Sequence, residues 1–201
     1  MKLTYGERLI NRFALVVLLS VSNSVIAQTF QDPLDAYIRG DFVNAREIWK
    51  PMAERGNAIA QTNLGIMYRY GDGVHEDNTE ALKWFRLAAE QGDELAQFNL
   101  GVMYAEGIGV PKDNAEAVKW YGLAAEQGEI RAQFKLGVMY CKGEGIPKDY
   151  VQAYKWLDLA AISGDLIAKR KQETISIQMT PDQIVEARHL AREWEAINRV
   201  R

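Results

Sequence analysis

The apolar residues between Gly56 and Gly164 follow helical periods, and the whole pattern recurs in three copies of 36 residues. Each copy has two apolar stripes, and residues three or four positions apart share one face of a helix. The first stripe is Ala60, Leu64 and Tyr68, with copies Ala96, Leu100, Tyr104 and Ala132, Leu136, Tyr140; the second is Ala81, Trp84 and Ala88, with its own copies. The pattern therefore predicts three helix pairs. Exact repetition at this period is typical of a solenoid.

Polar residues and glycines mark the helix ends. Asp77, Asp113 and Asp149 precede the second helices, and Glu80, Glu116 and Gln152 follow three residues later, which predicts reciprocal capping boxes. Glycines after each second helix suit left-handed caps, and the Gly-x-Gly pairs that begin at Gly71, Gly107 and Gly143 predict turns. These pairs do not follow a strand, so they do not predict a phosphate-binding loop.

Gly65, Gly101 and Gly137 fall inside the first helices, where glycine costs about 1 kcal/mol relative to alanine. A neighbouring helix that approaches closely would explain the missing side chains. We expect the alanine pairs that begin at Ala88, Ala124 and Ala160 to supply the matching small surface, with Trp84, Trp120 and Trp156 filling the wider spaces.

The pattern divides the chain into one elongated repeat domain and a leader. We expect a truncated first repeat or cap over 28–56, three full repeats over 57–92, 93–128 and 129–164, and a degenerate repeat with a capping helix over 165–201. In the degenerate repeat, Gln172 and Glu173 replace the expected leucine and glycine. Thr180 and Pro181 then signal the start of the last helix.

Residues 1–27 predict a cleaved signal peptide. Lys2, Arg8 and Arg12 precede an apolar run over 13–21, and Val25 and Ala27 form a small-residue cleavage site. A membrane anchor is the alternative, but it needs about 20 apolar residues, and Ser20 interrupts this run early. We therefore expect a periplasmic or secreted protein that begins at Gln28 and has no stable membrane insertion after cleavage.

Composition narrows the classes of partner. The chain is 48% hydrophobic, as folded proteins are, and its formal net charge is −3. Its one basic cluster, 169–171, is too short for a nucleic-acid surface, so we expect no nucleic-acid partner. Cys141 is the only cysteine, so disulfides do not staple the fold. It is either a tolerated small side chain or a candidate for pairing with another chain.

The sequence offers no catalytic constellation, cofactor site or metal site. His75 lies in a loop between helices, and its counterparts in the other copies are prolines. His189 and Glu193 have the spacing i, i+4, which could hold a metal, but no third ligand is evident. Cys141 has no histidine nearby in sequence to activate it. We therefore expect a non-catalytic protein.

Each copy contains A-x-x-x-L-G-x-x-Y, then G-x-G, then a capped helix with A-x-x-W and L-A-A. With these landmarks the chain resembles the Sel1-like repeat (SLR) family, relatives of the tetratricopeptide repeats, over 57–164. The resemblance implies an all-α, right-handed superhelical solenoid of antiparallel helix pairs, whose first helices line a concave face. It also implies a scaffold that holds a protein or peptide partner, in an envelope complex or at a host.

A hydrolase, or a protein that binds cell-wall or penicillin-type ligands, is the alternative function within the same family. Some cysteine-rich members are credited with binding penicillin-like compounds. They carry paired cysteines in each repeat, whereas this chain has one cysteine in total.

Positions on the first helices that differ between copies, while the apolar stripe does not, are candidates for partner contact. By the family geometry these positions line the concave face, and ordinary variation of solvent-facing residues is the alternative. The predicted contact residues are Arg69, Tyr70, Leu95, Phe98, Glu106, Arg131, Phe134, Cys141 and Lys142; Ile59, Thr62 and Ala105 occupy the same positions in other copies.

Overall fold

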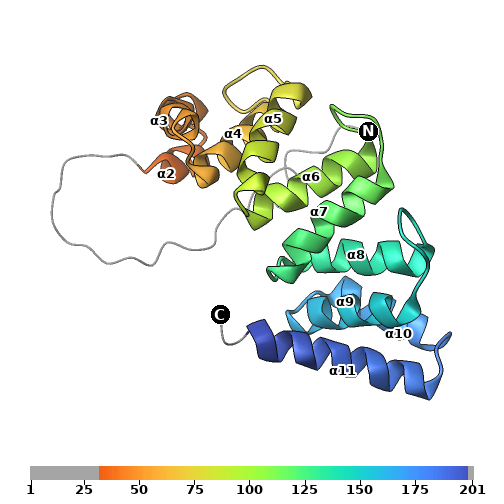
Figure 1. The fold of residues 1–201 in the computed structure, drawn as a ribbon. Coiled ribbons are helices and arrows are strands. Elements are labelled where there is room, and N and C mark those ends of the chain that lie inside the picture. The colour runs from red at the N-terminus through yellow and green to blue at the C-terminus, as the bar shows by residue number, and fades with distance from the viewer. Residues whose placement is uncertain (1–31, 199–201) are drawn as a thin grey trace, which may run out of the picture. The chain divides into compact units, whose positions relative to one another are not determined.

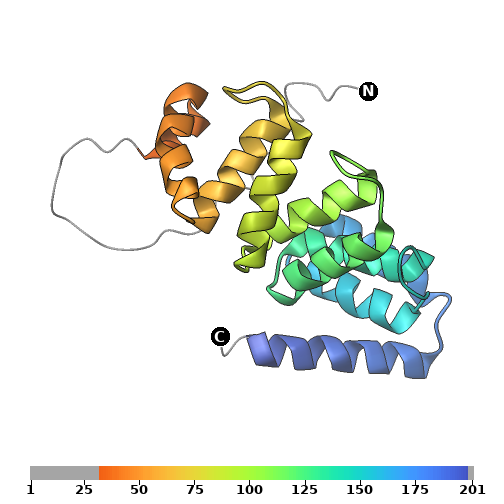
Figure 2. The ribbon, with the colours of Figure 1, turned by 45° about the horizontal axis from the view of Figure 1, so that its top comes forward.

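The computed structural model describes residues 32–198, and this part of the chain contains helices and no strand. The signal peptide predicted for residues 1–27 lies outside the described residues. In Figures 1 and 2 the helices from α2 to α10 follow one another in chain order, and α11 returns to pack against α9. They are α2 (Pro33–Ile38), α3 (Phe42–Glu54), α4 (Ala58–Tyr70), α5 (Asn78–Glu90), α6 (Glu94–Glu106), α7 (Asn114–Glu126), α8 (Ile130–Lys142), α9 (Tyr150–Ile162), α10 (Leu166–Ser176) and α11 (Pro181–Asn198).

Each of the three full copies folds into one pair of helices, α4 with α5, α6 with α7 and α8 with α9. The second helix of each pair also packs against the first helix of the next, so every layer is buried by its neighbours. The prediction of an all-α solenoid of helix pairs is confirmed. The short first unit, α2 and α3, joins the array through a hydrogen bond of 2.6 Å from the Tyr37 hydroxyl to Asp72 Oδ2.

The glycines inside the first helices do allow close packing, but against a different residue from the one we expected. A Cβ atom added to Gly65, Gly101 or Gly137 would lie within 2.5–2.8 Å of Phe85, Tyr121 or Leu157. These buried side chains follow the tryptophans in sequence and point at the glycines. The expected contact with the alanine pairs is wrong, because the large residue of the second helix faces the glycine of the first.

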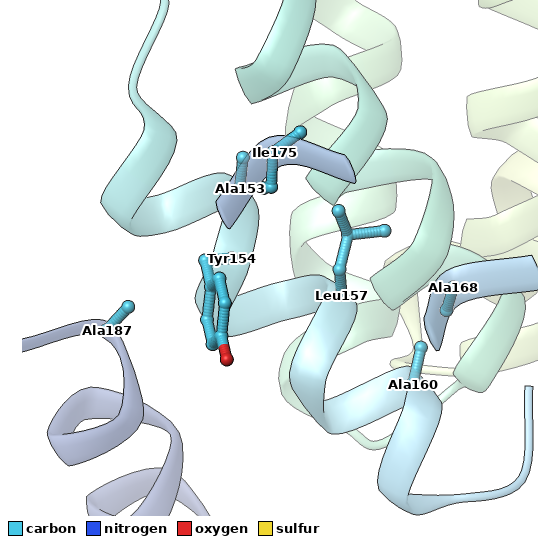
Figure 3. Close-up of a cluster of buried hydrophobic side chains, with 7 residues drawn as sticks. All are labelled: Ala153, Tyr154, Leu157, Ala160, Ala168, Ile175 and Ala187. Atoms are coloured by element: carbon cyan, nitrogen blue, oxygen red, sulfur yellow. The ribbon is translucent and has the colours of Figure 1, made fainter. Parts of the chain in front are cut away.

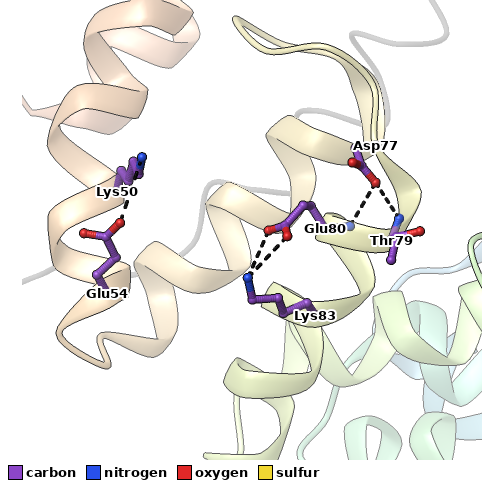
Figure 4. Close-up of polar contacts among 6 residues, drawn as sticks. All are labelled: Lys50, Glu54, Asp77, Thr79, Glu80 and Lys83. Carbon is purple, nitrogen blue, oxygen red and sulfur yellow. Dashed lines mark hydrogen bonds and ion pairs between the residues drawn. The ribbon is translucent and has the colours of Figure 1, made fainter.

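The predicted capping boxes form only in part. Asp77 Oδ1 accepts hydrogen bonds from the backbone N–H groups of Thr79 and Glu80, as Figure 4 shows. The reciprocal bond is absent at this cap, because the Asp77 N–H donates to the Tyr68 carbonyl and Glu80 instead pairs with Lys83 at 3.3 Å. The same arrangement recurs at Asp113.

Buried glutamines connect consecutive repeats. Gln61 and Gln97 donate to the carbonyls of Ala53 and Ala89, and each accepts a hydrogen bond from the glutamine that ends the following second helix. Gln91 Nε2 lies 2.7 Å from Gln61 Oε1, and Gln127 Nε2 lies 2.8 Å from Gln97 Oε1. In the third repeat Ser163 replaces this glutamine, and the buried Oε1 of Gln133 has no hydrogen-bond partner.

We predict that Ser163→Gln raises the free energy of unfolding by about 1 kcal/mol, because it gives Gln133 Oε1 its missing donor. The matched variant Gln127→Ser should lower it by about 1–3 kcal/mol, because it leaves Gln97 Oε1 buried and unpaired. Urea unfolding of the two variants and the parent measures both changes. Equal stability of all three would show that these amide bonds contribute nothing net.

The C-terminal helices do not form another regular pair. Both α10 and α11 pack against α9. Figure 3 shows Ile175 of α10 beside Ala153 and Ala168 of α10 beside Ala160, toward opposite ends of α9, with Ala187 of α11 on the side of Tyr154. The predicted start of α11 carries a full capping box, since Thr180 N–H donates to Gln183 Oε1 and Gln183 N–H donates to Thr180 Oγ1.

Candidate functional site

The varied positions of the first helices form a common face, which we call the first-helix face. It comprises positions 59, 62, 69 and 70 and their copies at intervals of 36 residues. Two contacts join neighbouring first helices there. The Thr62 hydroxyl donates to Asp93 Oδ1 at 2.9 Å, and the Arg131 guanidinium lies 4.3 Å from the centroid of the Phe98 ring.

Side chains at the helix starts combine variation with exposure. Ile59 is exposed, and Leu95 and Arg131 are half-buried, whereas the alanine that follows each of them is buried and does not vary. Ile167 occupies the same position in the fourth unit and is 66% exposed. Sequence reasoning missed Ile167 because the lost leucine and glycine made this unit look degenerate. The buried alanine in register, Ala168, was the signal that could have identified it.

Phe98 must be removed from the predicted contact residues. Its side chain is only 8% exposed, its ring lies 5.8 Å from that of Tyr121, and the Arg131 guanidinium covers it. The ring fills the space between α6 and α7, so it packs the helix pair instead of offering a surface to a partner. Arg131 takes its place at the surface.

Two acidic residues at the helix starts organise the charges of this face. Glu129 accepts hydrogen bonds of 2.6 Å from the Arg131 Nε and from the Ala132 N–H, so it pairs with the arginine and caps α8. Asp93 caps α6 in the same way and accepts the Thr62 hydroxyl. Burial raises the pKa of Asp93, while the bonds from Ala96 and Thr62 oppose that change.

At the other end of the first helices the charge alternates from repeat to repeat. Arg69 donates to Asn78 Oδ1 at 3.2 Å and lies over the half-buried Tyr70 ring. Glu106 is exposed on α6, and Lys142 is exposed on α8, where it pairs with Glu144 at 3.3 Å. Because exposed pairs of this kind contribute little to stability, these charges remain available for recognition.

Phe134 and Cys141 present only part of their surface. Both are half-buried and pack against a buried cluster that α9, α10 and α11 form. The Cys141 thiol is free. Their role in packing limits what either residue can offer to a partner.

The described part of the chain, residues 32–198, has no group of three or more histidine, cysteine, aspartate or glutamate residues that could hold a metal ion. His75 Nδ1 lies 3.0 Å from the Glu76 carbonyl oxygen, and His189 Nδ1 lies 3.5 Å from Glu193 Oε2; both histidines are exposed. None of the helices described is long and apolar enough to cross a membrane.

The comparisons with known proteins agree on the repeat. The family model for the Sel1 repeat matches residues 58–93, 95–129 and 130–165, and each match covers one helix pair. The crystal structure of a Sel1 repeat protein from Oxalobacter formigenes is similar, with a TM-score of 0.70 and 33% identity, and the match covers 80% of this chain and 68% of that one. A comparison with curated proteins gave no match.

Two further bacterial structures are more distant. A protective antigen of uropathogenic Escherichia coli strains, which displays an SLR fold, is 29% identical with a TM-score of 0.44, over 80% of this chain and 46% of that one. Cysteine-rich protein B of Helicobacter pylori is 20% identical with a TM-score of 0.48, over 71% of this chain and 96% of that one. Sel1 repeat proteins are in general non-catalytic scaffolds for protein interactions. By its three matched repeats, this chain belongs to the Sel1 repeat family.

Proposed function

We propose that the mature chain is an exported scaffold that holds a protein or peptide partner on its first-helix face, in an envelope complex or at a host. The proposal rests on the difference between two neighbouring positions at the start of each first helix. Ile59, Leu95, Arg131 and Ile167 differ from copy to copy and reach the surface, whereas the buried alanines next to them are constant. Packing constrains the second set and leaves the first free to suit a partner.

The chemistry of this face suits an extended or helical segment with both apolar and charged side chains. Apolar side chains at Ile59, Leu95 and Ile167 can bury aliphatic or aromatic groups of the partner. Charges of both signs at Arg69, Glu106 and Lys142 can select its orientation. The contact set that we propose is therefore Ile59, Arg69, Tyr70, Leu95, Glu106, Arg131, Lys142 and Ile167, with smaller contributions from Phe134 and Cys141.

We predict that Leu95→Ala or Tyr70→Ala weakens binding of the partner by about thirtyfold, the change expected when an anchor worth about 2 kcal/mol is truncated. The partner is first recovered from an envelope extract with the mature chain as bait. Its affinity is then measured by isothermal titration. Circular dichroism checks that each variant remains folded.

Charge reversals on the first-helix face are compared with one charge reversal elsewhere on the chain. Glu106→Lys and Lys142→Glu should mainly lower the association rate and change its salt dependence. Lys50→Glu removes an exposed lysine of α3 that pairs with Glu54 at 4.0 Å, as Figure 4 shows, and should leave binding unchanged. An equal loss from Lys50→Glu, or no loss from any first-helix variant, would contradict the proposed site.

We predict that the exported chain begins at Gln28, because Val25 and Ala27 fit a small-residue cleavage site. Intact mass of the protein purified from its native compartment measures the start directly. A product that retains Met1 and fractionates with membranes would contradict cleavage. It would also contradict the proposed periplasmic or secreted location.

A further inference from the structure

Three leucines at equivalent positions of the second helices differ sharply in exposure. Leu87 of α5 is 40% exposed and Leu123 of α7 is 45% exposed, whereas Leu159 of α9 is only 2% exposed. The three residues are separated by intervals of 36 residues, so the repeat places them on the same side of each second helix. The difference lies in what covers α9.

The element that covers α9, and has no counterpart on α5 or α7, is α11. The Trp194 ring lies 6.3 Å from the Trp156 ring in an edge arrangement, and Arg188 Nε donates to the Tyr154 hydroxyl at 3.1 Å. Lys155 is half-buried there, although its equivalents Lys83 and Lys119 are exposed. Burial accordingly lowers the pKa of Lys155 and raises the pKa of Asp158. This side of a second helix is thus a surface on which another helix packs.

The contact of α11 extends as far as α7. Trp194 Nε1 donates to Glu126 Oε2 at 2.7 Å, and a Cβ atom on Gly128 would lie 3.8 Å from the Trp194 ring. The established interface between α11 and α9 is therefore continuous with the end of α7 and stops there. The remaining length of α7 on this side carries Ala115, Val118, Gly122 and Leu123, which we call the Leu123 face.

The Leu123 face has the composition of a helix-packing surface. Residues 115, 118 and 122 follow the spacing i, i+3, i+7 of one helix stripe. A Cβ atom added to Gly122 would meet no atom within 4 Å, so the glycine leaves a recess beside the exposed Leu123 side chain. Small residues in such a stripe allow the backbone of a second helix to come close.

We propose that the Leu123 face receives an amphipathic helix of a protein partner, which lies beside α11 as α11 lies on α9. This inference rests on the proposed scaffold function and names the class of element that the partner contributes. The partner helix brings aliphatic side chains at i, i+3 or i+4 and i+7, with one of them seated over Gly122. An acidic residue at its edge faces Lys119, which is exposed on the same helix and would share its charge with Glu116, 3.3 Å away.

The partner helix is not α11 of a second copy. Next to α9, Arg188 and Arg192 of α11 lie near the Asp158 carboxylate and act on its pKa. On α7 the equivalent residue is Gly122, which offers these arginines no carboxylate. The Leu123 face therefore suits a helix that lacks arginines at these two positions, whereas α11 carries both.

Site-specific photo-crosslinking in cells that produce the full chain tests this inference. Benzoylphenylalanine replaces Leu123, Leu95 of the first-helix face, or Ile162, which is exposed at the end of α9. We expect an adduct at position 123, none at 162, and a crosslinked segment that is amphipathic. A synthetic peptide of that segment should become helical on binding, and Leu123→Asp should weaken its binding at least tenfold, while Ile162→Asp should leave it unchanged.

The outcomes separate the two proposals. Adducts at position 95 without any at 123 would overturn this inference and leave the scaffold function standing. Adducts at neither position would count against both. A crosslink from 123 to a second copy of this chain, to a segment that stays non-helical, or to a peptide that binds Leu123→Asp normally would also overturn the inference.

Discussion

Tyr121→Ala lowers the free energy of unfolding by about 3–5 kcal/mol, the range for aromatic residues truncated in a packed core. Tyr121 is buried in the central repeat, its ring contacts Phe98, and it faces Gly101 so closely that a Cβ on this glycine would lie 2.5 Å from Cδ1. Because this side chain fills the space between α6 and α7, its removal leaves a cavity that Gly101 cannot fill. Chemical denaturation followed by circular dichroism measures the loss.

Neighbouring residues of α7 provide the controls. Trp120→Ala should cause a loss of similar size, since Trp120 is buried as well, whereas Leu123→Ala should change the stability by less than about 0.5 kcal/mol. If Leu123→Ala were as damaging as Tyr121→Ala, the face of α7 that packs on α6 would have been assigned incorrectly. A Tyr121→Ala variant that unfolds like the parent would contradict the packing between Gly101 and Tyr121.

The repeat unit was largely predictable from the sequence, because the helical period and the helix ends are local signals. The stripes through Ala60 and Leu64, the aspartate caps and the glycines after the second helices are all where the pattern predicts them. The rotation of one helix against the next is not local. The sequence therefore predicted a close approach at Gly101 but assigned it to the alanine pairs instead of Tyr121.

The candidate site was predictable only in part for the same reason. Variation between copies correctly distinguished Leu95, Glu106 and Lys142 from the buried stripe. It failed at Phe98, because the residues at this position differ in how they pack inside the array. Thr62 hydrogen-bonds to Asp93 in one repeat, and the Phe98 ring lies between Tyr121 and Arg131 in the next. Exposure depends on residues of neighbouring repeats, and a pattern within one repeat contains no information about them.

The helix against which α11 packs also depends on residues that are distant in the sequence. The start of this helix followed from Thr180 and Pro181, and the structure buries Ala187 and Ala191 on one side of it. A regular array would place it against α10. The structure places it on α9, where Trp156 contacts Trp194 and the Tyr154 hydroxyl accepts a hydrogen bond from Arg188.

The second glycine of each Gly-x-Gly turn is required for two reasons. The turn needs a positive φ, and the preceding repeat leaves no room for a side chain. Gly145 has a φ of +74°, which already favours glycine. A Cβ atom there would also lie 2.3 Å from the backbone carbonyl oxygen of Asn114, at the start of α7 in the preceding repeat. A backbone atom at a helix start cannot move aside as the end of a flexible side chain can.

We therefore expect Gly145→Ala to lower the free energy of unfolding by about 2–5 kcal/mol. Left-handed backbone costs an alanine about 1–2 kcal/mol, and overpacking adds about 1–3 kcal/mol. Gly164→Ala is the matched control, because its φ is +101° but a Cβ atom would meet nothing within 4 Å. Gly164→Ala should therefore lose only the stability that corresponds to left-handed backbone, about 1–2 kcal/mol.

Urea unfolding measures the difference between the two variants. Hydrogen exchange then tests where it acts, because Gly145→Ala should speed exchange in α8 and α9 by loosening their contact with α7, whereas Gly164→Ala should not. Equal losses of stability would show that the turn conformation alone requires glycine at position 145. A larger loss for Gly145→Ala, together with faster exchange in the third repeat, would establish that this glycine holds consecutive repeats together.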